Sequence, residues 1–475
     1  MLLDPDLLAS VVSAHRAQGL DLLELFAEQT VTSAMVLKDG RIADATSGRE
    51  IGVGIRMRRG GSFVYSHAND IAPAAVLDVA RKAASLAAGL PSSDDAAPRR
   101  TSAAGTVPVT GASGGEGAAR DATAACFGER AHQAALLLSV PDLVAEGGGV
   151  TSVTAVIRNE HRVRDIANSL GARASGTDTR RRLAITVALG PSTSPASARA
   201  SIAVNAPGAG LGEEAVREAV HEAVRRARAR VGVSPAPTGE MPVVLAAGTG
   251  AVLIHEACGH GLEGDHLSRR SSAFQDLLGR RVGPSDLHIV DDGGLSGAWG
   301  SSEFDDEGHR TARTPLVENG VLVGYMWDLA HLPAPHEAVP ANGRRQNYQC
   351  PPLPRMTNTL VLPGSVAPGD IVADTVRGIY VARLGSGRVN TATGDFVFAA
   401  TEAYAIRRGR LCEPLADCSL IGNGPDVLRG IDAIGTDFAM GPPGSCGKDG
   451  QTVPVGYGQP TLRVRTGLRI GGTKA

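Results

Sequence analysis

A proline- and glycine-rich break divides the chain near its middle. Residues 233–240 read VSPAPTGE, and their two prolines and one glycine interrupt helices and strands alike. A single hydrophobic core usually stops growing at about 250–300 residues, and this chain has 475. We therefore predict two domains, residues 1–234 and residues 235–475.

The first half combines helical and strand patterns. Apolar residues tend to recur at every second position between residues 21 and 67, with turn residues at Asp39-Gly40 and Gly60-Gly61. This pattern predicts antiparallel strands, and a second group of strands is predicted at 150–204. Together with the helical patterns it predicts an N-terminal α+β domain whose helices pack on an antiparallel sheet. The predicted helices run from Pro5 to about Gly19 and over 73–86, 123–138 and 213–231.

Two other stretches complete the predicted architecture. Residues 91–121 are rich in Ser, Gly, Ala and Pro without apolar periodicity, which is typical of a flexible loop. Most of the second half consists of short Val, Leu and Ile runs between Gly and Pro clusters, as in VENGVLVGYMW. We therefore predict an α+β protein whose C-terminal domain is β-rich and carries one helix, near 250–262.

Charge and hydropathy narrow the class of protein. The formal net charge is −2, from 47 basic and 49 acidic residues, so the chain lacks the bulk positive field that favours nucleic-acid binding. No apolar run approaches the ~20 residues of a membrane span, and Asp4 and Asp6 lie where a signal peptide would carry positive charge. The six cysteines form no C-x-x-C motif, which favours a reducing compartment. We predict a cytoplasmic protein without nucleic-acid or membrane partners.

One segment carries the residue types of a metal hydrolase. The stretch MPVVLAAGTGAVLIHEACGHGLEGDH predicts a strand, a glycine turn and a helix with His255, Glu256 and His260. Imidazoles can hold a metal while a neighbouring carboxylate takes a proton from water. Five residues of an ideal helix rotate by about 140° beyond a full turn, which would splay the two histidines. We therefore predict a distorted helix at 255–260, eased by Gly259.

A third ligand is needed to complete such a site. Spacing on the helix favours Cys258, although a buried apolar role is the more common one for such a cysteine. Cys446 lies in the glycine-rich stretch GPPGSCGKDGQTVPVGYGQP, which predicts a loop where Lys448 could favour the thiolate. Spacing alone leaves the choice open among Cys258, Glu263, Asp265, His266 and Cys446.

Six blocks of sequence, in order, resemble the TldD/PmbA family, and in particular its TldD branch. The blocks are HEACGHGLEGD, FDDEGHRTARTPLVENGVLVGYMWD, GRRQNYQCPPLPRMTNT, NTATGDFVFAATEAY, LIGNGPDVL and SCGKDGQTVPVGYGQPTLRV. They cover nearly all of residues 240–475, with weaker similarity at 21–90 and 147–232.

The resemblance implies a zinc metallopeptidase. It maps the metal ligands to His255, His260 and Cys446 and the general base to Glu256. It also implies a heterodimer with a sister TldE/PmbA chain that lacks the metal motif. Two departures are Cys258, where the family has a small aliphatic residue, and the long stretch at 91–121.

These observations lead to one expected function and two alternatives. We expect a divalent metal, most consistent with Zn²⁺, to activate water while Glu256 moves the proton, so that the chain cleaves short or unfolded peptides. A specialised hydrolase that matures a natural-product peptide is one alternative. A noncatalytic peptide-binding subunit with a structural metal is the other.

Four further patterns resemble functional motifs but have simpler structural explanations. The G-x-S-x-G spelling at Gly111–Gly115 lies in the predicted loop, and the glycines at 208–212 fail the dinucleotide-binding spacing. The arginines near the end of the 213–231 helix are typical of a solvated face. Asp305, Asp306 and Glu307 resemble a second metal site, but an acidic turn before a hairpin is the more common interpretation.

Overall fold

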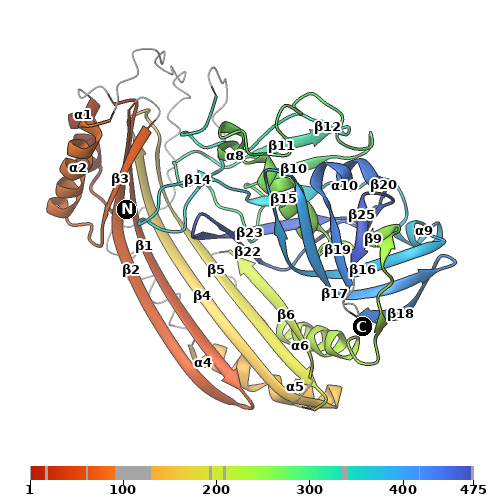
Figure 1. The fold of residues 1–475 in the computed structure, drawn as a ribbon. Helices are drawn as coiled ribbons and strands as arrows, with labels where there is room; N and C mark the ends of the chain where they lie inside the picture. Colours follow the sequence, from red (N-terminus) through yellow and green to blue (C-terminus); the bar gives the residue numbers. More distant parts are fainter. Residues whose placement is uncertain are drawn as a thin grey trace.

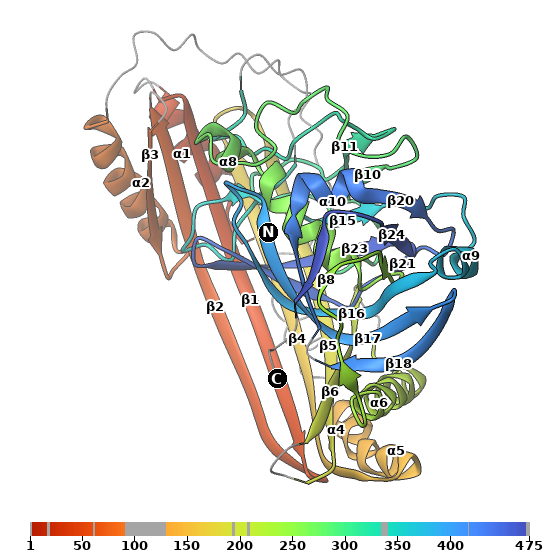
Figure 2. The same ribbon diagram turned by 45° about the vertical axis from the view of Figure 1, so that its right-hand side comes forward.

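The computed structural model describes residues 2–16, 20–59, 62–90, 130–191, 195–206, 210–333, 341–416 and 418–471. Within these ranges, the strands before residue 206 form one six-stranded sheet in the order β3-β2-β1-β4-β5-β6, and all neighbouring strands are antiparallel. It is long and curved, and it lies along one side of the C-terminal half (Figures 1 and 2). The strands are β1 (Leu22–Lys38), β2 (Arg41–Arg59), β3 (Ser62–Ala68), β4 (Val150–Asn168), β5 (Arg173–Leu189) and β6 (Ala196–Asn205).

The two faces of this sheet differ in chemistry because side chains alternate along each strand. On β1, Leu23, Leu25 and Leu37 point to one face, where helices cover them. Glu24 and Glu28 point to the opposite face, towards the C-terminal half, and are buried there. We call this second surface the polar face of the sheet.

Helices cover the apolar face in two groups. α1 (Pro5–Arg16) and α2 (Pro73–Ala88) pack at one end, and α4 (Arg130–Leu138), α5 (Val140–Gly147) and α6 (Glu213–Arg228) pack at the other (Figure 1). Helices α1, α2 and α6 agree with the predicted positions, and α4 ends at Leu138, as predicted. The sequence interpretation missed α5, whose eight residues are too few to show clear periodicity. The predicted loop at 91–121, the start of the 123–138 helix and the Gly60-Gly61 turn lie outside the described residues.

The C-terminal half is β-rich, as predicted. In its described part, one sheet has the order β20-β24-β9-β16-β17-β19-β25-β8, with β18 and β7 at its side, and a second has the order β12-β11-β10-β15-β23-β21, with β22 against β23. A large apolar core lies between them. The first sheet comprises β7 (Ser234–Pro235), β8 (Gly239–Glu240), β9 (Val243–Leu245), β16 (Arg377–Val389), β17 (Asp395–Arg407), β18 (Arg410–Ala416), β19 (Cys418–Asn423), β20 (Ile431–Ile434), β24 (Leu462–Val464) and β25 (Leu468–Gly471).

The second sheet and the remaining short elements complete this half. The turn between β11 and β12 has positive φ at Asn319 (49°) and Gly320 (74°), as in the hairpin expected from VENGVLVGY. The second sheet comprises β10 (Ile289–Asp292), β11 (Arg313–Glu318), β12 (Val321–Leu322), β15 (Asn358–Val361), β21 (Ala439–Met440), β22 (Gly444–Lys448) and β23 (Gln451–Gln459). A separate pair of strands and four short helices are β13 (Gly343–Arg344), β14 (Leu353–Pro354), α7 (Ala251–Ile254), α8 (Gly264–Ser268), α9 (Pro368–Ala373) and α10 (Gly424–Gly430).

The predicted linker at 233–240 contributes two short strands instead of running free. β7 pairs with β18, and β8 pairs with β25, so this stretch borders the larger C-terminal sheet. Such short edge strands tolerate proline because one side needs no ladder hydrogen bond. We keep the division into residues 1–234 and 235–475 as a proposal, since the six-stranded sheet ends before this stretch and the other sheets begin within it.

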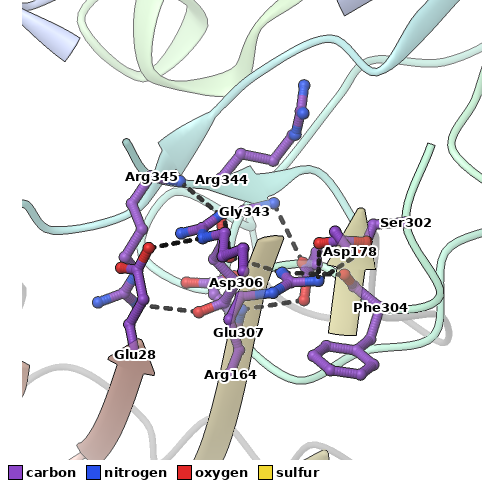
Figure 3. Close-up of polar contacts among 12 residues, drawn as sticks. Glu28, Arg164, Asp178, Ser302, Phe304, Asp306, Glu307, Gly343, Arg344 and Arg345 are labelled. Carbon is purple, nitrogen blue, oxygen red and sulfur yellow. Dashed lines mark hydrogen bonds and ion pairs between the residues drawn. The ribbon is translucent and has the colours of Figure 1, made fainter. Parts of the chain in front are cut away.

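Buried ion pairs join the polar face to the C-terminal half. Arg164 binds Asp178 and Asp306 at 2.7 Å each, as Figure 3 shows. Burial would raise the pKa of the Asp306 carboxyl, but Arg162 and Arg164 hold it well below its usual value. The acidic triplet at 305–307 therefore forms a turn, as expected, but a buried one, and the ligand atoms of Asp305, Glu307 and His309 lie within 4.8 Å of one another. Each of the three carboxylates is buried and accepts a hydrogen bond from a backbone N–H group, and arginines of the N-terminal sheet also bind Asp306 and Glu307.

The arginines of α6 agree only in part with the prediction of a solvated face. Arg225 binds Glu402 of β17 at 2.8 Å, and it also binds Glu222 within α6. Arg383 of β16 reaches the same Glu222 at 2.6 Å. Arg225 and Arg226 are therefore paired within the chain, while Arg225 stays half-exposed and Arg228 and Arg230 are exposed to solvent.

Arg345→Met is expected to lower the free energy of unfolding by about 3–5 kcal/mol, because it leaves Glu24 buried with less compensating charge. Arg345 is fully buried, binds Glu24 and lies 4.2 Å from the centre of the Phe26 ring. The measurement is the urea unfolding midpoint. Lys82→Met is the matched control, since Lys82 makes its ion pair with Asp78 at the surface. Equal midpoints for the two variants would contradict a stabilising role for the buried network.

Candidate metal centre

Both histidines lie in a short helical segment in which a single turn contains an extra residue. α7 leads into a π-helical turn, His255–Gly259, followed by a 3₁₀ turn, His260–Leu262. The backbone N–H of His260 donates to the carbonyl of His255, five residues earlier. This insertion brings the two imidazole rings within 5.5 Å, centre to centre. The predicted distortion at 255–260 is therefore present.

Gly259 has a different role from the one expected. Its backbone is helical, with φ of −54°, so no unusual conformation requires glycine. Instead, a Cβ atom at this position would lie 2.0 Å from the sulfur of Met356. The missing side chain lets the turn approach Met356, which lies between β14 and β15.

Cys446 joins the histidines from the other end of the sequence. The ligand atoms of His255, His260 and Cys446 all lie within 4.8 Å of one another, and all three residues are buried. Cys446 Sγ lies 3.2 Å from His260 Nε2. Cys446 is in β22 of a tight hairpin, not in the loop that was expected, and Arg355 donates a 2.6 Å hydrogen bond to its carbonyl. The hairpin is therefore fixed in place by contacts outside itself.

The donor set fits a soft divalent metal. Both ring nitrogens of His255 are buried without a hydrogen-bond partner in the described part of the chain, an arrangement that is costly unless a ligand satisfies them. Burial would raise the pKa of the Cys446 thiol, but the two imidazoles lower it to about 4. Two imidazoles and a thiolate are ligands that zinc accepts in tetrahedral sites.

Glu256 lies beside this cluster without being buried in it. Its carboxylate oxygen is 3.6 Å from His260 Nε2, and its side chain is 31% exposed to solvent. On the other side, the ring of Tyr457 lies 6.3 Å from that of His255. Glu256 is thus near the ligand atoms and open to solvent, as a group that exchanges protons must be.

A buried carboxylate, Glu263, holds the ring of His260 through its Nδ1 atom. Glu263 accepts a hydrogen bond from His260 Nδ1 at 2.9 Å, which leaves Nε2 directed at Cys446. Lys448 binds Glu263 at 2.9 Å and Asp265 at 2.5 Å. Lys448 therefore neutralises these carboxylates and does not contact the thiolate, contrary to the expectation. Sequence reasoning nominated Glu263 only as a ligand, although its spacing of three residues from His260 was available as a signal.

Of the alternative ligands, Cys258 lies in the apolar core. It packs among residues such as Leu253, Leu262 and Phe274, and burial raises the pKa of its thiol. Glu263, Asp265 and His266 lie close to one another, but Lys448 binds the two carboxylates. The structure thus brings only Cys446, among the five nominees in its described part, together with both histidines.

Two family models match this chain. Residues 238–472 match the PmbA/TldA metallopeptidase C-terminal domain, and residues 23–87 match the PmbA/TldA metallopeptidase domain 1. Together the two matches cover more than half of the chain.

Two curated relatives and one solved structure illustrate the similarity. A metalloprotease TldD homolog of Buchnera aphidicola is 42% identical over 239 residues, which are 50% of this chain and 49% of that protein. A zinc metalloprotease TldD homolog of Saccharolobus solfataricus is 32% identical over 240 residues, covering 50% and 53%. The match thus spans about half the length of each relative.

The solved structure shows that the fold is shared over the whole chain. TldE from Thermococcus kodakarensis superimposes with a TM-score of 0.76 at 16% identity, covering 98% of this chain and 100% of that one. The matched domains, the curated relatives and the shared fold lead to one conclusion. The chain belongs to the TldD/PmbA family of metallopeptidases.

Proposed function

We propose that this chain is a metal-dependent peptidase, with zinc as the metal, that hydrolyses short or unfolded peptides. The observation that carries the proposal is the convergence of His255, His260 and Cys446 beside Glu256. A site that serves only to stabilise the fold is usually closed by four protein ligands, whereas a catalytic one keeps a position open. Three ligand atoms with an adjacent, partly exposed carboxylate correspond to the second kind.

Each side chain has a distinct task in the proposed reaction. When bound, zinc supplies a Lewis acid that activates water and polarises a carbonyl group. Glu256 accepts the proton of the attacking water and passes it to the amine of the leaving peptide. His255, His260 and Cys446 hold the metal, while Glu263 fixes the ring of His260.

The surroundings of the site support an extended substrate. A cavity of about 640 Å³ lies between the polar face and the Cys446 hairpin, and a second of about 600 Å³ lies between β6, α6 and the C-terminal half, with Trp299 lining both. Residues of the Cys446 hairpin line the first, and Gly456 of β23 lines the second. A peptide without tertiary structure could lie along these spaces, whereas a folded domain could not enter them.

The partner and the location are part of the proposal. The shared fold with TldE supports a heterodimer of this chain with a TldE-like sister subunit. In the described residues no helix combines the length and apolar character needed to cross a bilayer. We propose a cytoplasmic location, where reducing conditions would keep the Cys446 thiol available to the metal.

Chelation and metal restoration test the proposal. The purified chain, alone and with a TldE-like partner, should cleave an unfolded protein such as reduced, alkylated casein. Cleavage should stop when a chelator removes the metal and return when zinc is added. Bound metal without cleavage under any of these conditions would favour a noncatalytic subunit. Cleavage confined to one natural-product precursor would favour a specialised maturation enzyme.

Glu263→Gln is expected to weaken zinc binding about 10–100-fold, because the substitution removes the carboxylate that orients His260. Zinc affinity can be measured by competition with a chromophoric chelator. Glu318→Gln is the matched control, since Glu318 is exposed on β11, far along the chain from the histidines. Unchanged zinc affinity in Glu263→Gln would show that the hydrogen bond to His260 has no positioning role.

A further inference from the structure

A cavity of about 640 Å³ separates the polar face of the sheet from the hairpin that carries Cys446. Thr32 and Thr46 of the long N-terminal strands line one side, and Ser445 and Pro454 of the hairpin line the other. Ser445 directly precedes Cys446 in the sequence. The cavity therefore borders the hairpin that carries one of the proposed metal ligands.

Two arginines in this cavity lie directly opposite each other. Arg158 of β4 and Arg182 of β5 are cross-strand neighbours, and both line the cavity. Like charges in this arrangement destabilise a sheet. Burial lowers the pKa of Arg182, and the positive charges of Arg199 and Arg158 lower it further. The protein thus maintains a local excess of positive charge at an energetic cost.

Several other arginines on the polar face are paired with carboxylates. Arg56 binds Glu24 and Glu307, and Arg164 binds Asp178 and Asp306. By contrast, neither Arg158 nor Arg182 has a carboxylate within ion-pair distance in the described part of the chain. Arg182 makes one long contact, 3.5 Å, with the hydroxyl of Ser201, and its Nε is buried without a hydrogen-bond partner.

The one carboxylate that lines the cavity does not compensate these charges. Glu160 lies 3.7 Å from Arg180, a third arginine of the cavity wall. Arg180 is further held by the carbonyls of Trp299 and Ser301. Arg180 also lies 3.8 Å from Asp178, so both carboxylates pair with Arg180, whereas Arg158 and Arg182 lie beyond ion-pair distance of either.

Arg182 is also within electrostatic range of the reaction centre. Burial raises the pKa of the Tyr457 phenol to about 12, with Arg182 lowering it and Glu256 raising it. Both charged groups therefore act on the same side chain, whose ring lies next to His255.

We propose that Arg158 and Arg182 form a subsite for a carboxylate of the peptide substrate. The carboxylate comes from an acidic side chain or from the C-terminus of the peptide, since arginine binds both in the same way. This proposal rests on the proposed peptidase function and gives it a preference for acidic or C-terminal segments. Arg182, which is more buried, makes the larger contribution, and Arg158 attracts the anion from a more exposed position.

The subsite is tested by measuring peptide binding to a variant that cannot cleave the peptide. The receptor is the zinc-loaded full-length Glu256→Gln chain. The reference probe is a neutral fluorescent peptide with an amidated C-terminus. One set of probes replaces Gln by Glu at successive positions, and another probe restores the free C-terminal carboxylate. The set that binds more tightly identifies the source of the carboxylate.

Arg182→Gln in this receptor should weaken binding of the preferred acidic probe about tenfold and leave the neutral probe unchanged. It should not lower the thermal midpoint, because it removes a repulsion between like charges. Arg158→Gln should act in the same direction with a smaller effect. Arg217→Gln, an exposed arginine of α6, is the control and should change neither probe.

Three results would overturn the subsite. They are equal binding of acidic and neutral probes, equal weakening of both by Arg182→Gln, and no measurable binding of any probe. Cleavage is scored separately with the wild-type chain. Cleavage without preference for acidic peptides would reject the subsite and retain the peptidase. Selective binding without cleavage would retain the subsite and reject the peptidase.

Discussion

Glu256→Gln is expected to reduce the rate of peptide cleavage about 10²–10⁴-fold while leaving zinc bound, which is the usual size of a general-base contribution. Glutamine has nearly the same shape but cannot accept the proton of water. Glu256 is not among the three convergent ligand atoms, so the metal should stay. The measurements are kcat with an unfolded substrate and the zinc content of the same sample by elemental analysis.

The design of this experiment separates chemistry from folding. The 31% exposure of the Glu256 side chain means that its replacement should leave the thermal midpoint near that of the wild type. Glu318→Gln again serves as the control for removing one carboxylate from the surface. Full activity in Glu256→Gln would exclude Glu256 as the base, and loss of zinc together with activity would assign it to the metal ligands instead.

Cys446→Ala should lower zinc affinity by more than the 10–100-fold typical of losing a supporting hydrogen bond, because it removes a ligand directly. Cys258→Ala should retain the wild-type zinc content. The comparison is informative because both cysteines are buried, yet only the thiol of Cys446 has a lowered pKa, about 4, while burial raises that of Cys258. Elemental analysis after dialysis against a weak chelator measures the difference.

The fold should survive the change at position 446. The Cys446 side chain packs against Val453 and Val455 within its own hairpin, and Arg355 holds the backbone carbonyl rather than the thiol. Circular dichroism of the two variants should therefore coincide. Zinc loss confined to Cys258→Ala would reverse the assignment, and equal retention by both variants would show that neither cysteine is a ligand.

Elements with a clear local pattern were predictable from the sequence. Alternating side chains and the Asp39-Gly40 turn specify the hairpin of β1 and β2, and Pro73 marks the start of α2. Short elements were not predictable in this way. α5 has eight residues and β22 has five, so neither shows enough periods to separate it from a loop.

Buried charges were the least predictable feature, because their environment comes from distant parts of the chain. Asp306 looks like a surface residue in the sequence, yet Arg164, 142 residues earlier, covers it. The same holds for Lys448, which meets Glu263 across 185 residues. Their partners are set by the packing of sheets and not by spacing.

By itself, the sequence determined the His-Glu-His segment of the proposed site and the distortion of its helix. The spacing of His255 and His260 requires an extra residue in the helical turn, because helical rotation is a local property of the backbone. The choice of Cys446 over Cys258 was decided by tertiary structure, since it depends on how the β22–β23 hairpin packs against that turn. Tertiary structure likewise decided which arginines of the polar face are neutralised and which, at 158 and 182, are left facing the cavity. The range of the interaction explains the difference: backbone geometry acts over a few residues, whereas burial and ion pairing depend on surfaces that only the folded chain brings together.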